Sequence, residues 1–126
     1  MLNKSKLKRQ RWTSKKTRLK YYLKQKNINN LPRLVVFKSN CNIFLQLLDD
    51  VNNNTLLSSS SIDKELKVAI DKSKGKIEKS KIVGVSIAEK MKKEKIDQII
   101  FDRNGYKYHG RIKAVGDAIR EAKIQI

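Results

Sequence analysis

Apolar positions between residues 33 and 60 come in short runs separated by polar segments. The runs RLVVFK, IFLQLL and TLLSS are rich in β-branched or large apolar residues, whereas SNCN and DDVNNN have the composition of turns. The pattern predicts three consecutive antiparallel strands, a meander, at residues 33–38, 43–48 and 55–59.

The second half of the chain alternates between helical and extended patterns. Residues 78–95 predict a helix with a buried stripe of Ile82, Val83, Ile87 and Met91, in which Gly84 and Ala88 permit close approach. Residues 111–123 predict another, with one face formed by Ile112, Val115, Ile119 and Ala122. DQIIF, at 97–101, predicts a fourth strand, and residues 62–76 are polar with room for a short helical turn.

This order of elements predicts an α/β fold. A helical crossover joins the third strand to the fourth, and we expect the last helix to cover the other face of a mixed sheet.

The N-terminal segment has a different pattern, without Pro, Gly or acid between residues 2 and 26. A helix there would align Lys4, Lys8, Arg11, Lys15 and Arg18 in one stripe, beside a thin apolar seam. Like charges at this spacing repel, so we expect the segment to be disordered alone and helical when bound to a polyanion. We therefore divide the chain into a basic arm, residues 1–28, and one α/β domain, residues 29–126.

Charge sharpens this division. The 126 residues include 30 Lys and Arg against 12 Asp and Glu, a net charge of +18, and 13 of the basic residues precede the first acid, Asp49. Such a surface attracts nucleic acid or anionic membrane, but a membrane helix needs a broad apolar face that the arm lacks. The alternative for the arm is a solvated charged helix. A removable organelle-targeting segment is a second alternative, although the arm is not rich in serine.

Cysteine and histidine usage narrows the chemistry. One cysteine, Cys41, excludes an intramolecular disulfide, and with the single histidine, His109, it leaves too few ligands for structural zinc. No apolar stretch approaches the length of a membrane span, so a reducing, cytoplasmic location is expected.

A second candidate site is the segment FDRNGYKYHGRIK, residues 101–113, which interleaves cations with aromatic residues between two glycines. Gly110 precedes a predicted helix, whose free N–H groups favour phosphate, and tyrosines can stack on bases. An ordinary strand-to-helix loop with core-facing tyrosines remains the alternative.

Enzymatic constellations are thin. His109, Asp102 and a serine can be drawn as a triad, but nothing else in the sequence supports one. A metal-dependent nuclease needs several acids on the sheet, and the first strand has none. We expect no enzyme, no cofactor, no metal and no small-molecule substrate. The alternatives kept open are a DNA-binding architectural protein and such a nuclease.

The segments KLKRQRWTSKKTRLK, LPRLVVFKSNCNIFLQLLDD, TLLSSSS and IIFDRNGYKYHGRIKAVGDAIREA occur in an order that resembles the bacterial-type large-subunit ribosomal protein eighteen family. The resemblance implies a ribonuclease H-like topology with a mixed sheet between helices. It also implies a structural protein that binds 5S rRNA, contacts 23S rRNA in the central protuberance and lies near ribosomal protein five. The location would be a bacterial-type ribosome in the cytoplasm or an organelle.

The charge pattern, the loop chemistry and the resemblance together select candidate RNA contacts. They are Lys4, Lys8, Arg9, Arg11, Lys15, Lys16, Arg18 and Lys20 in the arm, then Arg33, Lys38, Ser39 and Asn40, and finally Arg103, Tyr106, Tyr108, His109, Gly110, Arg111 and Lys113. The chain departs from the family pattern at Cys41–Asn42, which removes positive charge from a turn. It also departs at Asn104 and Lys123, where a small residue, usually Gly, is expected.

Overall fold

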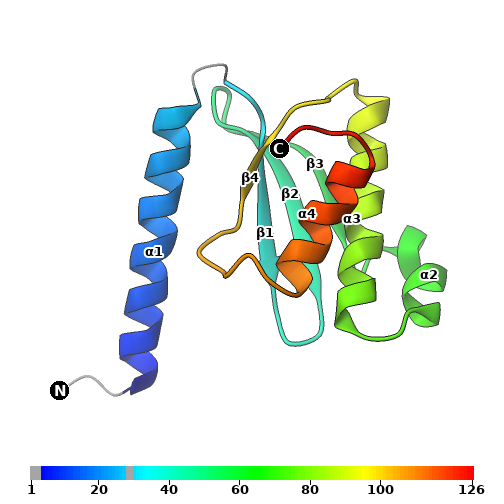
Figure 1. Ribbon diagram of the computed structural model, residues 1–126, viewed down its shortest axis with the longest axis horizontal. Coiled ribbons are helices and arrows are strands. Elements are labelled where there is room, and N and C mark those ends of the chain that lie inside the picture. The colour runs from blue at the N-terminus through cyan, green and yellow to red at the C-terminus, as the bar shows by residue number, and fades with distance from the viewer. Residues whose placement is uncertain (1–3, 28–29) are drawn as a thin grey trace.

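The computed structural model describes residues 4–27 and 30–126, so residues 1–3 and 28–29 of the predicted arm and linker lie outside the described residues. The elements follow one another as α1 (Lys4–Lys26), β1 (Arg33–Lys38), β2 (Ile43–Asp49), β3 (Asn54–Ser60), the 3-10 turn η1 (Lys64–Leu66), α2 (Lys67–Lys72), α3 (Lys76–Lys93), β4 (Ile100–Asp102) and α4 (Arg111–Glu121), as Figure 1 shows. Most bounds agree with the predicted ones to within about two residues.

The sheet has the strand order β3-β2-β1-β4. β1 pairs antiparallel with β2, and β2 with β3, whereas β4 pairs parallel with β1 through partners such as Leu34 and Phe101. The mixed sheet, made of a meander and a fourth strand reached by a helical crossover, is therefore confirmed.

The fourth strand is shorter and later than predicted. Residues 97–101 were expected, but β4 begins at Ile100, because the residues before it pair with the C-terminal tail instead of β1. The Ile99 N–H donates to the Gln125 carbonyl at 2.9 Å, and the Gln125 N–H donates to the Asp97 carbonyl at 2.9 Å.

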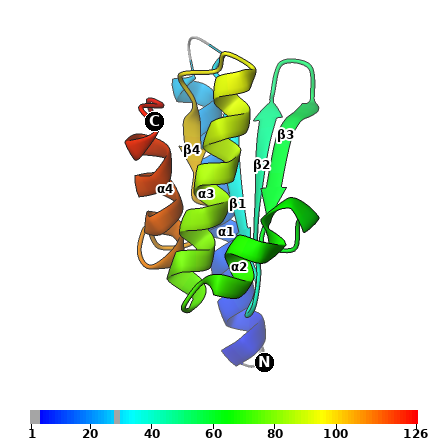
Figure 2. The ribbon, with the colours of Figure 1, turned by 90° about the vertical axis from the view of Figure 1, so that its right-hand side faces the viewer.

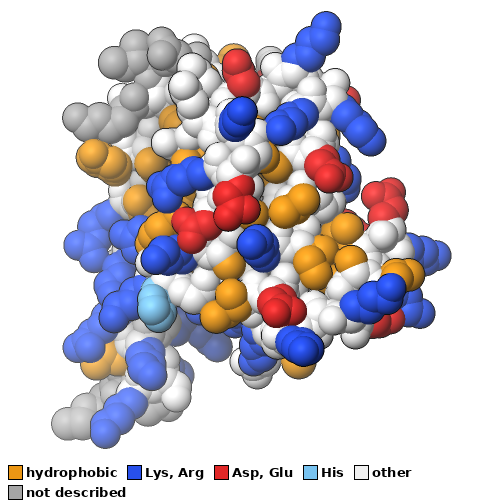
Figure 3. Space-filling view, turned by 45° about the vertical axis from the view of Figure 1, so that its right-hand side comes forward, with side chains coloured by type: hydrophobic (Ala, Val, Ile, Leu, Met, Phe, Trp, Pro, Cys, Tyr) orange, Lys and Arg blue, Asp and Glu red, His pale blue; other side chains and the backbone are white. Residues whose placement is uncertain are grey.

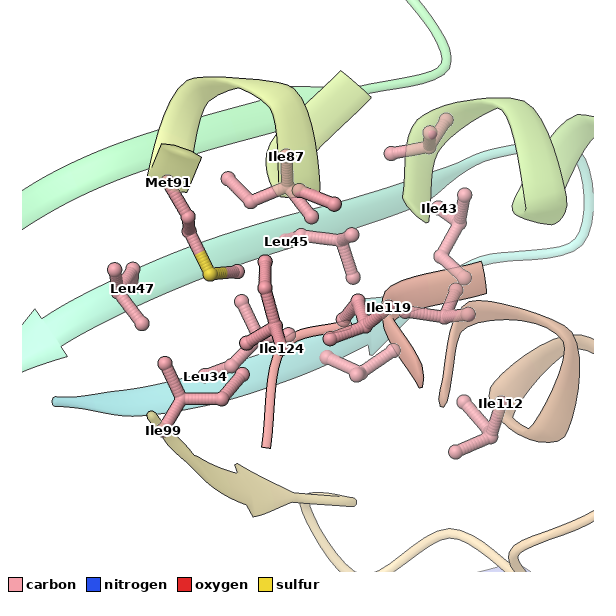
Figure 4. Packing of buried hydrophobic residues seen from close by; sticks show 14 residues of the cluster. Leu34, Ile43, Leu45, Leu47, Ile87, Met91, Ile99, Ile112, Ile119 and Ile124 are labelled. Carbon is pink, nitrogen blue, oxygen red and sulfur yellow. The ribbon is translucent and has the colours of Figure 1, made fainter. Parts of the chain in front are cut away.

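The core lies on one face of the sheet. Side chains that alternate along β1 and β2, among them Leu34 and Leu45, meet the buried faces of α3 and α4 (Figure 4). Burying each such side chain contributes about 1.5–3 kcal/mol. The prediction that Ile82 belongs to the buried stripe of α3 is wrong, because this side chain is only partly buried and lies outside the core cluster.

The expectation that the last helix covers the other face is wrong. Helix α4 packs beside α3 over the same core, and a Cβ added at Gly84 would lie 3.0 Å from the Ala118 Cβ, which shows how closely the two helices approach. An apolar stripe such as that of α4 favours burial without fixing the side of the sheet. In Figures 1 and 2, α1 lies on the opposite side of β4 from α3 and α4, and β4 is its main contact.

None of the described helices combines the length and the apolar character needed to cross a membrane.

Candidate nucleic-acid interface

Arg33, one of the candidate RNA contacts, is buried in the scaffold. Its side chain forks onto Asp50, with Nε–Oδ2 at 3.0 Å and Nη2–Oδ1 at 3.1 Å, and Nη1 also donates to the Asp102 carboxylate. The residue is 5% exposed and Asp102 is fully buried. Burial alone would lower the pKa of Arg33, but the hydrogen bonds and charges of Asp50 and then Asp102 outweigh it and raise that pKa. The structure therefore does not present this guanidinium to a partner.

Both carboxylate oxygens of Asp102 also have partners within the protein. Its second oxygen accepts a hydrogen bond from the Asn104 N–H at 2.8 Å, so its carboxylate serves the ion pair and the loop rather than a catalytic triad. Among the described residues no group of three or more His, Cys, Asp or Glu is placed to hold a metal ion.

Tyr106 joins three segments that are far apart in the sequence. Its ring lies 5.5 Å from the Trp12 ring of α1, centroid to centroid. Lys38, at the end of β1, places its Nζ 5.0 Å from the Tyr106 ring centroid, and its N–H donates to the Tyr106 hydroxyl at 3.5 Å. Within the loop, Arg103 Nη1 donates to the Tyr106 carbonyl at 2.8 Å. The arm, the β1–β2 turn and the 103–110 loop therefore form one surface around Tyr106.

Lys16 extends this surface along α1. Its Nζ lies 4.6 Å from the centroid of the Trp12 ring, so the two side chains form a cation–π interaction. Trp12 is half-buried against Tyr106. It positions the arm, and the cation lies over its ring.

The β1–β2 turn, residues 39–42, is held from two sides. The Ser39 N–H donates to the Asn42 carbonyl at 2.9 Å, and the Asn42 side chain accepts a bond from Ser61 Oγ at 2.9 Å. Arg111 Nη1 donates to the Ser39 carbonyl at 2.7 Å. The turn thus lies against the N-terminus of α4, and Asn42 gives it a structural anchor where the family pattern would have a cation.

Tyr108 is built into the scaffold side of the loop. Its ring meets Phe101 edge-on at 5.9 Å, and its hydroxyl accepts a hydrogen bond from Arg120 Nη1 at 3.0 Å. A Cβ added at Gly116 would lie only 2.3 Å from that hydroxyl, so the absence of a side chain on α4 makes room for the ring. Tyr108 nevertheless keeps 37% of its surface exposed.

The remaining candidates lie at the surface. Gly110 has a left-handed φ of +59° immediately before α4, a conformation that glycine adopts most readily. His109 and Lys113 are exposed, as are Lys38, Ser39 and Asn40 of the turn region.

The cations of α1 are mostly turned to solvent. Lys4, Lys8, Arg9, Arg11, Lys15 and Arg18 are exposed, whereas Lys16 and Lys20 are half-buried on the side facing the domain, with Trp12, Leu19 and Leu23. In Figure 3 this helix forms the blue projection at the lower left. The thin apolar seam expected from the sequence thus meets the domain, and the stripe of cations stays accessible.

Both departures at glycine positions have a backbone explanation. Asn104 has φ +56° and Lys123 has φ +65°, so each occupies the left-handed region in which Gly is favoured.

Some residues of this surface were not found from the sequence. Lys76 and Lys79, in the first turns of α3, line a hollow together with Cys41 and Arg111 and add two cations beside the turn. Several other lysines lie close to them in the sequence, so only the tertiary arrangement distinguishes them. Gly116 and Arg120, which hold Tyr108, carried no signal beyond an ordinary helix.

A small, strongly basic α/β protein in which exposed cations and aromatic rings from three segments form one surface is typical of the proteins that bind nucleic acid. Residues 4–126 match the family described as "Ribosomal L18 of archaea, bacteria, mitoch. and chloroplast", and the chain belongs to this family. Family membership confirms the expectation that the chain is not an enzyme, because the family consists of structural ribosomal proteins.

Three relatives illustrate the similarity, and each is called "Large ribosomal subunit protein uL18". The protein of Fusobacterium nucleatum is 59% identical over 91 residues, which are 72% of this chain and 74% of the relative. That of Synechococcus sp. (strain CC9902) is 43% identical over 122 residues, 96% of this chain and 98% of the relative. That of Lactobacillus delbrueckii subsp. bulgaricus is 50% identical over 90 residues, 71% and 72% of the two chains.

Proposed function

We propose that the chain is a structural protein of the large ribosomal subunit that binds 5S rRNA and helps attach it to 23S rRNA in the central protuberance, near ribosomal protein five. The observation that carries the proposal is the surface around Tyr106, where α1, the β1–β2 turn and the 103–110 loop lie together. Lys16, Lys38 and Arg103 are the cations of this surface. The names of the relatives support the ribosomal location.

The mechanism follows from charge and shape. The exposed cations of α1 neutralise successive phosphates and release their counterions, which supplies affinity. The sheet and its two packed helices hold the turn and the loop rigidly, so the RNA is bound in one orientation. No chemical step is involved.

The first test is binding of the full chain to 5S rRNA and to duplex DNA at matched salt. Tighter binding of the RNA is expected, and equal affinity for both would favour a DNA-binding architectural protein instead. With on the order of six phosphate contacts, affinity for the RNA falls by about three decades between 50 and 200 mM salt. Magnesium-dependent cleavage of the RNA would indicate a nuclease.

The second test locates the cations that bind phosphate. Replacing Lys4, Lys8, Arg11 and Lys15 with Ala should lower the slope of log affinity against log salt by about one for each phosphate that is no longer neutralised. The matched control removes the same charge from exposed positions away from this surface: Lys92, Lys93, Lys95 and Lys123. Equal decreases in slope for the two variants would show that net charge alone, and not the placement of α1, drives binding.

A further inference from the structure

A groove on the far side of the domain from α1 differs from the rest of the surface. It lies between Leu66, at the end of η1, and the outer face of α3, with Ile82 and Val85 also among its lining residues and a volume of about 540 Å³. Ligand-binding clefts in proteins commonly have volumes of this order. Exposed apolar side chains are also present on α2, which follows η1 directly, and on α3, including Val68 at 67% and Ile77 at 58% exposure. Figure 3 shows apolar side chains gathered on the right-hand side of the view, with acidic side chains among their neighbours.

An apolar cluster of this kind marks an interaction surface more often than a scatter of single residues does. Leu66 packs against the core, but Ile82 and Val85 do not belong to the core cluster, because the opposite face of α3 places its buried residues against the sheet and α4. The outer face of α3 is therefore available for a partner.

The charges on that face select the partner. Glu78, Ile82, Val85 and Glu89 succeed one another at helical spacing and form one stripe of α3, with an acid at each end and apolar residues between. The two acids are eleven positions apart in the sequence, which places them about 16 Å apart along the axis at 1.5 Å per residue. Lys81 is the only cation among the described residues that line the groove with them. Carboxylates at both ends of the groove repel phosphates, so this surface is unsuited to the RNA bound by α1.

We propose that the η1–α3 groove docks an amphipathic segment of another protein, with Lys or Arg about 16 Å apart on either side of an apolar stretch. The apolar side chains of that segment cover Ile82 and Val85, and its two cations pair with Glu89 and with Glu78, whose Oε2 also accepts a hydrogen bond from the Lys74 N–H at 2.6 Å. The chain then binds polyanion on the α1 side and a basic protein segment on the α3 side. This goes beyond the proposed function, because it concerns another surface and another class of partner.

The test uses the full chain in its native cell, with a photoreactive benzoylphenylalanine placed at Val85. A second variant carries the group at Lys81, which is exposed and keeps the test available if the Val85 variant does not fold. After irradiation, the expected adduct is one protein, attached within an apolar peptide that has Lys or Arg on both sides. Adducts with RNA, adducts with a second copy of this chain, or the absence of an adduct from both positions would each overturn the proposal.

A charge reversal makes the test specific. Glu78→Lys with Glu89→Lys should lower the adduct yield at least about tenfold, because two attractive pairs become repulsive. Glu94→Lys with Glu121→Lys makes the same change in net charge at exposed positions outside the groove and should leave the yield unaltered. Equal yields from the two double variants would also overturn the proposal. A parallel probe at exposed Tyr21 in α1 should form RNA adducts, so a failure of the proposed RNA-binding function is detected separately.

Discussion

Helices α1 and α3 are both long, yet the chain holds them in place by different means. α3 buries Val83, Ile87 and Met91 in the core and contacts α4, β2 and β3. α1 has 23 residues, none of them acidic, and contacts the sheet mainly at β4 through a half-buried seam around Trp12 and Leu19. Burial of apolar surface stabilises α3, whereas repulsion between cations opposes α1.

The difference shows that a helix can be prepared for a partner rather than for the core. Most helix stability in proteins comes from packing an apolar face, and α1 offers little of that. A bound polyanion would remove the repulsion and supply the missing stabilisation. We therefore expect the same sequence feature, a run of cations without acids, to weaken folding of the helix alone and to strengthen binding of a polyanion.

The largest expected effect is in amide hydrogen exchange of the free protein. Amides in the middle of α3 should be protected by the full free energy of unfolding, about 5–15 kcal/mol for a domain, whereas those of α1 should exchange with almost no protection. Addition of 5S rRNA should protect α1. Strong protection of α1 without RNA would show that the arm is already formed and would remove the contrast.

The second prediction separates cations of the scaffold from cations of the arm. Arg33→Ala leaves Asp102 buried without its charge partner, so the free energy of unfolding should fall by about 3–5 kcal/mol in urea titrations. Arg11→Ala, at an exposed position of α1, should change it by less than about 0.5 kcal/mol. Similar small changes in both variants would mean that the ion pair of Arg33 is not part of the scaffold.

The third prediction concerns Arg111, which joins the N-terminus of α4 to the β1–β2 turn. Removal of its guanidinium in Arg111→Ala should weaken binding of 5S rRNA by about 1–3 kcal/mol, since one charge-assisted hydrogen bond to RNA and the bond that holds Ser39 both disappear. Unfolding should change little, and Lys123→Ala serves as the binding control at the far end of α4. If the two variants bind RNA equally well, Arg111 is not a specific contact.

The smallest expected effect is at Lys123 itself. Its φ of +65° is strained for a residue with a side chain, so Lys123→Gly should raise the free energy of unfolding by about 1 kcal/mol. Lys95→Gly, at φ +60° after α3, is a companion test of the same principle. The stability of both variants can be measured from their thermal midpoints. A decrease at both positions would contradict the conclusion that a left-handed φ strains these helix ends.

The local pattern of the sequence carried most of the fold. A continuous run of β-branched and large apolar residues predicted β1 at residues 33–38, as observed, and four consecutive residues of this strand are buried. The side of the sheet on which α4 packs could not be predicted. Ile112, Val115 and Ile119 show which face of the helix is buried, but not which surface it packs against. β4 was misplaced because residues 97–99 pair with residues close to the C-terminus, a contact with no local signature.

In the candidate site, too, features with a local sequence signal were predicted, and features that depend on distant residues were not. The exposed cations of α1 follow directly from spacing and the absence of acids. The role of Arg33 does not, because its partners Asp50 and Asp102 are 17 and 69 residues away. Tyr106 and Tyr108 look alike in the sequence, yet one joins the arm to the turn and the other is seated on Gly116.

The pairing of Arg33 with Ile100 has a consequence for the order of events during synthesis. These partners are 67 residues apart, so β1 waits for its parallel neighbour until most of the chain has been made. At about 5–20 residues per second, that interval lasts roughly 3–13 seconds. Throughout it, the β1–β2 hairpin lacks β4 and α4, and the apolar side chains of Leu34 and Val36 are only partly covered. α1 is synthesised well before that. The nascent chain therefore exposes its cationic helix to RNA before the domain that fixes the orientation of this helix has folded.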